Sequence, residues 1–363
     1  MVEGRILTPD GWVGGRLVFG ATITAVEATG DASGPFILPG FIDPHVHGGG
    51  GADCMEGEAA TRQMARFHAR HGTTSLLATT VTAPADDLRA AMAGIGAVAA
   101  DPGPGEAVVV GAHLEGPFIS PDALGAQPPF AIAPDLGLVR ELCALAPLKV
   151  TTMAPEIDPD HTLLQFFRDQ GVRVQIGHTT GTYDDAVLAL DAGASGFTHL
   201  FNAMTPMHHR APGMVGAALA HAPHAEIILD FLHVGAGAAT VALRAIPGLY
   251  GITDAVAAAG MPAGEYRLGQ HRVFKDADAV RLEDGTLAGS TLTMDQVLRS
   301  LLGLGLSLEE ASRRVSTIAA DYLGLRDRGR LAPGALADIV VLGQDHRVLA
   351  VFVGGEGIDL TDG

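Results

Sequence analysis

The chain has 363 residues, of which 47% are hydrophobic and 18% charged, and its formal net charge is −18. This length fits one large domain, or a large domain with a small one. The strong acidity argues against general nucleic-acid binding, which depends on basic surfaces. It also means that a site for an anionic substrate must concentrate its own cations.

The cysteines and the apolar stretches indicate a cellular compartment. The two cysteines, Cys54 and Cys143, lack a spacing typical of a disulfide or a metal site and fit a reducing environment. The first residues show no charged-then-apolar signal pattern. No apolar stretch reaches the roughly 18–20 residues that cross a bilayer. We therefore expect a soluble, cytoplasmic protein with no membrane partner.

Short apolar runs alternate with amphipathic segments through the middle of the chain. Eight runs are predicted as strands, at residues 41–47, 73–80, 108–115, 148–155, 172–179, 195–202, 226–233 and 249–254. Apolar residues three or four positions apart predict helices at 59–70, 86–99, 136–145, 183–191 and 237–246. This alternation predicts a (β/α)8 barrel over residues 39–328. A doubly wound open sheet is the alternative, but no Gly-rich dinucleotide fingerprint follows an early strand.

The two ends of the chain have a different pattern from the middle. Residues 1–38 and 329–363 contain short β-like runs, and those near the N-terminus are broken by Gly and Asp. We expect both ends to fold together as one small β-sandwich domain beside the barrel.

The first predicted barrel strand ends in two histidines, His45 and His47, followed by four glycines at 48–51. Side chains two residues apart on a strand point to the same side, so these imidazoles can converge on one ion. Neutral imidazole is the commonest metal-binding side chain. An ordinary buried strand with two hydrogen-bonded histidines is the alternative.

Polar side chains also end several later strands, on the face where barrel enzymes place their active sites. These residues are Glu115, His178, His199 and Asp254. Each alone has a structural alternative, such as a helix cap or an ion pair, but together with His45 and His47 they predict a metal site. Asp254 could ligate the metal or exchange a proton with metal-activated water. His113, two residues before Glu115, would be a supporting group.

A second cluster has the chemistry of an anion site. The segment after the sixth strand contains Asn202, His208, His209 and Arg210, and the seventh strand ends with His233. An Arg fork, an imidazole and free backbone N–H groups suit a phosphate, and barrel phosphate sites often lie near the last strands. For His208 and His209 the alternative is a solvated loop without a binding role.

These motifs together resemble the amidohydrolase superfamily, and within it the branch that deacetylates amino-sugar 6-phosphates. The resemblance covers nearly the whole chain, at residues 39–51, 113–118, 176–179, 198–204, 253–255, 287–290 and 334–342. The segments Leu-Glu-Gly-Pro and His-Leu-Phe-Asn-Ala-Met are the most specific, whereas the C-terminal segment is widespread in the superfamily.

The resemblance implies a role for each site residue. The principal divalent metal would be bound by Glu115, His178 and His199. Asp254 would act as the general base and then as the general acid. The sugar phosphate would be held by Asn202, the backbone at Ala203, Arg210 and His233. Because a phosphate-binding residue can come from the neighbouring subunit in this family, the resemblance also implies a homodimer.

The metal and the acetyl contact vary within the family. Some members lack ligands at the positions of His45 and His47 and use one metal, so one or two ions per subunit remain open here. A second ion would be bridged by Glu115 or completed by Asp254. Zinc is the expected ion, and iron or another divalent ion is the alternative. Where some members have a histidine against the acetyl carbonyl, this chain has Gln127, which can donate a hydrogen bond but carries no charge.

The implied reaction is hydrolysis of the N-acetyl group of N-acetylglucosamine 6-phosphate, giving glucosamine 6-phosphate and acetate in amino-sugar catabolism. N-acetylgalactosamine 6-phosphate, which differs at one hydroxyl, is an alternative substrate. A different amidohydrolase, such as a deaminase or a cyclic-amide hydrolase, is a second alternative. Cyclic-amide hydrolases commonly carry a carboxylated lysine at the end of the fourth strand, whereas Lys149 lies at its beginning. A catalytically silent homologue with a binding role is the third.

Overall fold

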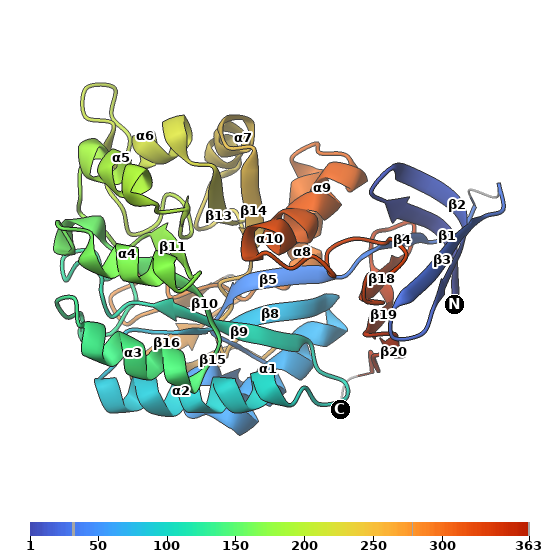
Figure 1. Ribbon diagram of the computed structural model, residues 1–363, viewed down its shortest axis with the longest axis horizontal. Coiled ribbons are helices and arrows are strands. Elements are labelled where there is room, and N and C mark those ends of the chain that lie inside the picture. The colour runs from blue at the N-terminus through green and yellow to red at the C-terminus, as the bar shows by residue number, and fades with distance from the viewer. Residues whose placement is uncertain (31–32, 278, 362–363) are drawn as a thin grey trace.

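The computed structural model describes residues 1–30, 33–277 and 279–361. Its larger part is built on eight parallel strands in the order β14-β13-β12-β11-β10-β9-β8-β5 (Figure 1). Their bounds are β5 (Phe41–Val46), β8 (Thr73–Thr80), β9 (Val108–Glu115), β10 (Leu148–Met153), β11 (Arg173–Ile176), β12 (Gly196–Phe197), β13 (His224–Ile228) and β14 (Gly248–Ile252). The predicted (β/α)8 barrel is confirmed.

The barrel strands are apolar along their length because they are covered on both sides. Every residue of β5 and β8 is buried, as expected for parallel strands between a barrel interior and a layer of helices. The later strands are shorter than predicted: β11 ends at Ile176 and β12 at Phe197. The chain leaves the sheet there because the residues that follow adopt a left-handed backbone.

The first and last barrel strands meet at a seam. The backbone N–H of Asp254 donates to the carbonyl of His45, and the N–H of His47 donates to the carbonyl of Ala255, both at 2.9 Å. Val46 and Ala255 also form a parallel bridge. These bonds hold the histidine pair of β5 beside the segment that follows β14.

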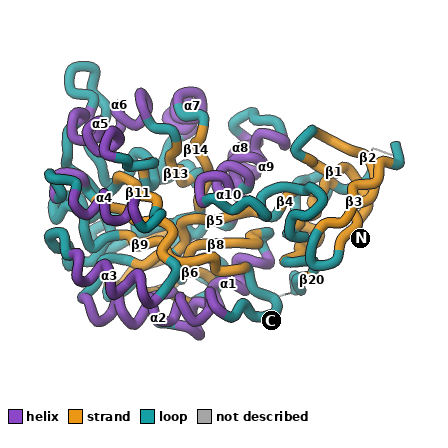
Figure 2. Tube along the Cα trace, in the orientation of Figure 1, coloured by secondary structure: helices purple, strands orange, loops and turns teal. Residues whose placement is uncertain are grey.

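Helices cover the outside of the barrel, as the purple segments around the orange strands show in Figure 2. They are α1 (Glu58–Arg70), α2 (Ala85–Ala100), α3 (Leu136–Leu145), α4 (Thr162–Asp169), α5 (Tyr183–Ala192), α6 (Gly213–His221), α7 (Ala236–Ala245), α8 (Met294–Gly303), α9 (Leu308–Val315) and α10 (Thr317–Leu323). Five of them match the predicted helices. The other five were not predicted: α4, which has only 8 residues, α6, whose residues are nearly all apolar or glycine and give no polar stripe, and α8, α9 and α10, which follow the last barrel strand. No helix within the described ranges is long and apolar enough to cross a membrane.

Both ends of the chain form a second sheet with the order β20-β19-β18-β4-β1-β2-β3 (Figure 1). Its strands are β1 (Val2–Thr8), β2 (Gly11–Phe19), β3 (Ile23–Ala28), β4 (Phe36–Pro39), β18 (Ile339–Leu342), β19 (Val348–Val353) and β20 (Glu356–Gly357). A separate apolar core, which includes Ile6, Leu17 and Ile339, lies under this sheet. The prediction that both ends of the chain fold together into a separate β-structure is therefore confirmed. The domain boundaries at residues 38 and 329 stay predictions.

A small antiparallel sheet is inserted between β14 and α8. It consists of β15 (Gly264–Leu268), β16 (His271–Lys275) and β17 (Val280–Arg281). Its own core includes Val273 and Val280, which cluster with Val81 and Val256. This insertion was not predicted. It brings Arg281 to the wall of a cavity at the carboxyl ends of the barrel strands, which we call the central cavity.

Candidate active site

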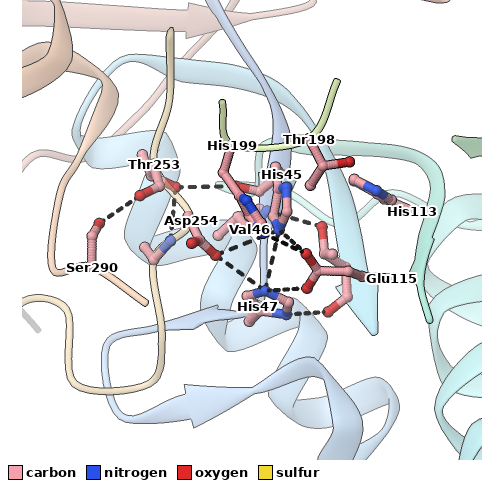
Figure 3. Close-up of polar contacts among 12 residues, drawn as sticks. His45, Val46, His47, His113, Glu115, Thr198, His199, Thr253, Asp254 and Ser290 are labelled. Atoms are coloured by element: carbon pink, nitrogen blue, oxygen red, sulfur yellow. Dashed lines mark hydrogen bonds and ion pairs between the residues drawn. The ribbon is translucent and has the colours of Figure 1, made fainter. Parts of the chain in front are cut away.

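Three of the predicted site residues stand in unusual backbone conformations. His178, His199 and Asp254 each follow the last residue of a strand by two positions. Their backbone φ angles are 48°, 28° and 49°, in a region that residues other than glycine rarely adopt. Such strain persists where the surroundings fix the conformation, and it gathers at active sites. The chain turns out of the barrel at these residues, and their side chains point to a common centre, as Figure 3 shows for His199 and Asp254.

Glu115 lies at this centre and contacts imidazoles on both sides (Figure 3). Its Oε1 is 3.2 Å from Nε2 of His178 and 3.0 Å from Nε2 of His199. Its Oε2 is 3.3 Å from Nε2 of His47. One carboxylate thus joins the two groups of histidines, which is the geometry of a bridging ligand.

The His45–His47 pair faces the same centre (Figure 3). The two Nε2 atoms are 3.2 Å apart. Asp254 Oδ1 lies 3.4 Å from Nε2 of His45 and 3.1 Å from Nε2 of His47. The structure therefore brings together all six residues that the sequence indicated for the metal site.

The hydrogen bonds behind the rings show that these residues fit a divalent metal. Nδ1 of His47 donates to the carbonyl of Thr79, and Nδ1 of His178 donates to the carbonyl of Ala123, both at 2.9 Å. A carbonyl only accepts, so each Nδ1 carries the proton and the Nε2 lone pair faces the centre. Among the described residues, three groups could each hold one ion: His45–His47–Glu115, Glu115–His178–His199 and His45–His113–Glu226. The first two share Glu115 and line the centre, whereas the third lies behind His45, which it shares with the first. Imidazole and carboxylate ligands suit zinc and related ions.

The buried carboxylates make the centre attractive to positive charge. Burial alone would raise the pKa of Glu115, but a protonated His45 ring, together with hydrogen bonding to His178, holds it well below its usual range. Burial also opposes ionisation of Asp254, yet His45 and His47 lower its pKa to about 2. Positive charge at this centre, on the rings or on an ion bound between them, therefore favours the ionised form of Asp254.

Gln127 supports Glu115 directly. Its Nε2 donates to Oε2 of Glu115, and its Oε1 accepts a hydrogen bond from the backbone N–H of Thr82 at 2.6 Å. The amide is thereby held with one N–H toward the centre. Its predicted hydrogen bond to an acetyl carbonyl, through the second amide hydrogen, stays a prediction.

A cavity of about 280 Å³ opens above the cluster. Three of the predicted phosphate residues line it, namely Asn202, Ala203 and His233. Burial favours the neutral form of His233, but its Nδ1 lies 2.6 Å from Oδ2 of Asp230 and this contact raises the pKa of the ring. Since Nδ1 is bound to Asp230, Nε2 remains for a ligand.

Arg210 lies elsewhere in the same chain. It is exposed, its guanidinium contacts Nε2 of His209 at 2.7 Å, and it is not among the residues that line the central cavity. His208 lines a separate cavity of about 560 Å³ beside α5 and α6. The phosphate role of Arg210 stays a prediction.

Arg281 is a cation that the sequence analysis missed. It ends β17, lines the central cavity together with His233, and its guanidinium donates to the carbonyl of Gly285 at 3.0 Å. The signal available was its place six residues before the 287–290 motif. The direction of the Arg281 side chain could not be predicted, because the sheet that carries it was not predicted.

The carboxylated lysine of the cyclic-amide hydrolases has no counterpart at this centre. Thr152 of β10 pairs with Glu115 of β9. Lys149 lies three residues before Thr152, toward the other end of the strand. Its side chain is therefore on the wrong level of the barrel to bridge two ions.

The barrel, with imidazoles and carboxylates converging at the carboxyl ends of its strands, defines the class of the protein: a barrel hydrolase. Residues 36–358 match the Amidohydrolase family. The chain belongs to the amidohydrolase family.

Relatives of known name cover nearly the same span. An N-acetylglucosamine-6-phosphate deacetylase of Lysinibacillus sphaericus is 40% identical over 88% of this chain and 84% of its own length. An N-acetylgalactosamine-6-phosphate deacetylase of Escherichia coli O157:H7 is 36% identical over 97% of both. A solved structure of a Mycobacterium smegmatis N-acetyl-D-glucosamine-6-phosphate deacetylase mutant, in complex with N-acetyl-D-glucosamine-6-phosphate, is 34% identical. It covers 98% of each chain with a TM-score of 0.90.

Proposed function

We propose that this protein is a metal-dependent deacetylase that hydrolyses N-acetylglucosamine 6-phosphate to glucosamine 6-phosphate and acetate. The observation that carries the proposal is the position of Glu115, whose two oxygens contact imidazoles on both sides, with the Asp254 carboxylate 3.4 Å from His45 and 3.1 Å from His47. Retention of the whole ligand set argues against a catalytically silent homologue. The names of the relatives support this substrate.

The residues divide the work as follows. Glu115, His178 and His199 would hold the principal ion, and His45 with His47 a second; zinc is the expected metal and iron the alternative. A bound divalent ion polarises a carbonyl and activates water. Asp254 takes a proton from the attacking water and passes it to the amide nitrogen, because an unprotonated amine anion is a very poor leaving group. Water and the acetamide thus give acetate and the free amino sugar.

Acetate release from a panel of N-acetylhexosamines tests this function. We expect turnover of N-acetylglucosamine 6-phosphate and much weaker turnover of the sugar without phosphate, because His233 and Arg281 would bind the anion. Equal kcat/KM with and without the phosphate would contradict the proposed substrate. Removal of metal by a chelator should abolish release, and added zinc should restore it.

A second substrate is favoured by one comparison. The relative from Escherichia coli O157:H7 is named N-acetylgalactosamine-6-phosphate deacetylase, and it covers 97% of this chain. N-acetylgalactosamine 6-phosphate therefore belongs in the same panel. A higher kcat/KM for this epimer would reassign the sugar without changing the reaction.

Removing the charge of Arg281 should weaken binding of the phosphate. For Arg281→Met we expect KM for N-acetylglucosamine 6-phosphate to rise about 10-fold or more, since a hydrogen bond to a charged group contributes about 1.5–3 kcal/mol. Arg267→Met, in the same small sheet but outside the central cavity, is the matched control. An unchanged KM in Arg281→Met would remove this residue from the substrate site.

We also propose a cytoplasmic homodimer in which Arg210 reaches the cavity of a second copy. The exposure of Arg210 and its absence from the cavity of its own chain support this arrangement. Sedimentation should give a dimer. A mixed dimer of one Arg210→Ala chain and one Asp254→Asn chain should contain one site that has both Arg210 and Asp254. Its activity should exceed that of a dimer of either variant alone. No gain on mixing would contradict the shared site.

A further inference from the structure

Glu226 is a buried carboxylate that the reaction described above does not use. It lies in the middle of β13 and has no exposed surface. Its Oε2 is 2.9 Å from Nδ1 of His45 and accepts a longer hydrogen bond, 3.3 Å, from the backbone N–H of His199. It therefore stands directly behind one of the proposed metal ligands.

This contact decides which face of the His45 ring carries a lone pair. A neutral imidazole has one N–H, and a carboxylate at Nδ1 keeps that N–H on the buried side. Nε2 then presents its lone pair to Glu115 and Asp254, at 3.6 and 3.4 Å. Carboxylates placed behind metal-binding histidines fix the ring orientation and increase its basicity.

The other three imidazoles of the centre depend on different partners. Nδ1 of His47 and of His178 donates to a backbone carbonyl. Nδ1 of His199 has no hydrogen-bond partner among the described residues. Of these four imidazoles, only His45 has a side-chain carboxylate of a described residue at Nδ1, so its orientation alone depends on a replaceable side chain.

Glu226 is itself held in place by a buried polar chain. Tyr250 O–H donates to Oε1 of Glu226 at 3.4 Å, and Gln175 donates to the Tyr250 oxygen at 2.8 Å. The Oε1 of Gln175 accepts from the hydroxyl of Thr198 at 2.9 Å. These residues come from β14, β11 and the end of β12, so the barrel interior fixes the direction of the carboxylate.

We propose that Glu226 is a positioning residue that determines whether the His45–His47 pair holds a second divalent metal. This inference rests on the proposed function, which assigns an ion to that pair. The two can be separated because the metal content of the unmodified protein tests the assignment, whereas a substitution at Glu226 tests the positioning.

The test is a titration of the full-length protein with zinc against a competing chelator, with metal counted by mass spectrometry. We expect two ions per chain in the unmodified protein. In Glu226→Leu the affinity for the second ion should fall about 10- to 100-fold, the usual effect of losing a residue that hydrogen-bonds to a metal ligand. The affinity for the first ion should not change. Glu226→Gln, which retains an acceptor oxygen, should rescue part of that loss.

Two further variants distinguish positioning from general damage to the barrel interior. Tyr250→Phe removes one long hydrogen bond to Glu226 but keeps the carboxylate and its contact with His45, so it should weaken the second ion less than Glu226→Leu does. In a His45→Asn background, Glu226→Leu should cause no additional loss of metal. If Glu226→Leu does not fold, the zinc affinity of Glu226→Gln is measured instead, once in the otherwise unmodified protein and once in the His45→Asn background.

The outcomes separate clearly. Two ions bound by folded Glu226→Leu with unchanged affinity would overturn the positioning role and leave the proposed function intact. Equal weakening of both ions would also overturn it, because that is the effect of a merely structural defect. An unmodified protein that binds one ion at saturating zinc would overturn the assignment of a metal to His45 and His47, and this inference with it.

Discussion

Replacing Asp254 with asparagine is expected to lower kcat for deacetylation by about 10²–10⁴-fold, the usual contribution of a general acid–base group. Asparagine keeps the size of the side chain and an oxygen near His45 and His47, but it cannot take up and return the proton. Metal content should therefore stay near that of the unmodified protein. Acetate release at saturating substrate and metal analysis of the same preparation measure both quantities.

Asp158→Asn is a matched control for this substitution. Asp158 is also a buried carboxylate, but it accepts hydrogen bonds from the backbone N–H groups of Leu163 and Leu164 at the start of α4. Asparagine is a good helix cap, so this variant should keep its kcat. Full metal content combined with unchanged kcat in Asp254→Asn would contradict the proton-transfer role.

Glu115→Gln is expected to lose both metal ions. Glu115 is the one residue common to the two groups to which the ions are assigned, His45–His47–Glu115 and Glu115–His178–His199. The amide supplies neither the charge nor two equivalent oxygens. The loss of metal affinity should exceed the roughly 100-fold that removal of an outer partner can cause. Zinc titration against a chelator measures it, and deacetylation should fall with the bound metal.

Glu106→Gln controls for the burial of a carboxylate. Glu106 is as buried as Glu115 but pairs with Arg62 and Arg66, at 3.1 and 2.7 Å, away from the central cavity. Its substitution should lower thermal stability and leave both ions bound. If Glu115→Gln kept two tightly bound ions while Glu106→Gln behaved as expected, the bridging assignment would be wrong.

The sequence predicted that the side chains of the centre converge, because the barrel topology determines where the strands end; their role as metal ligands stays a prediction. Once β5, β9 and β11 are predicted as parallel strands, residues at their carboxyl ends must meet at one face, and His47, Glu115 and His178 do so. No knowledge of individual rotamers was needed.

Other parts of the site depend on features that periodicity does not encode. Arg210 was predicted from the composition of an irregular loop, and a loop's direction is not set by hydrophobic spacing. Arg281 is carried by an inserted sheet with no helix–strand rhythm. Glu226 left a readable signal, since it is a charged residue inside the apolar strand β13, but its partner could be identified only in three dimensions.

The seam between β5 and the end of β14 also sets an order of events during synthesis. Asp43 and Thr253, which hydrogen-bond across it, are 210 residues apart in the chain. A ribosome-bound chain that has not yet produced residue 254 carries His45 and His47 on an open sheet edge. It still lacks the Asp254 carboxylate that faces both rings. Unpaired edges invite association with other chains. Asp254 can therefore join the other residues of the centre only after β14 has been made, and the edge of β5 stays unpaired until then.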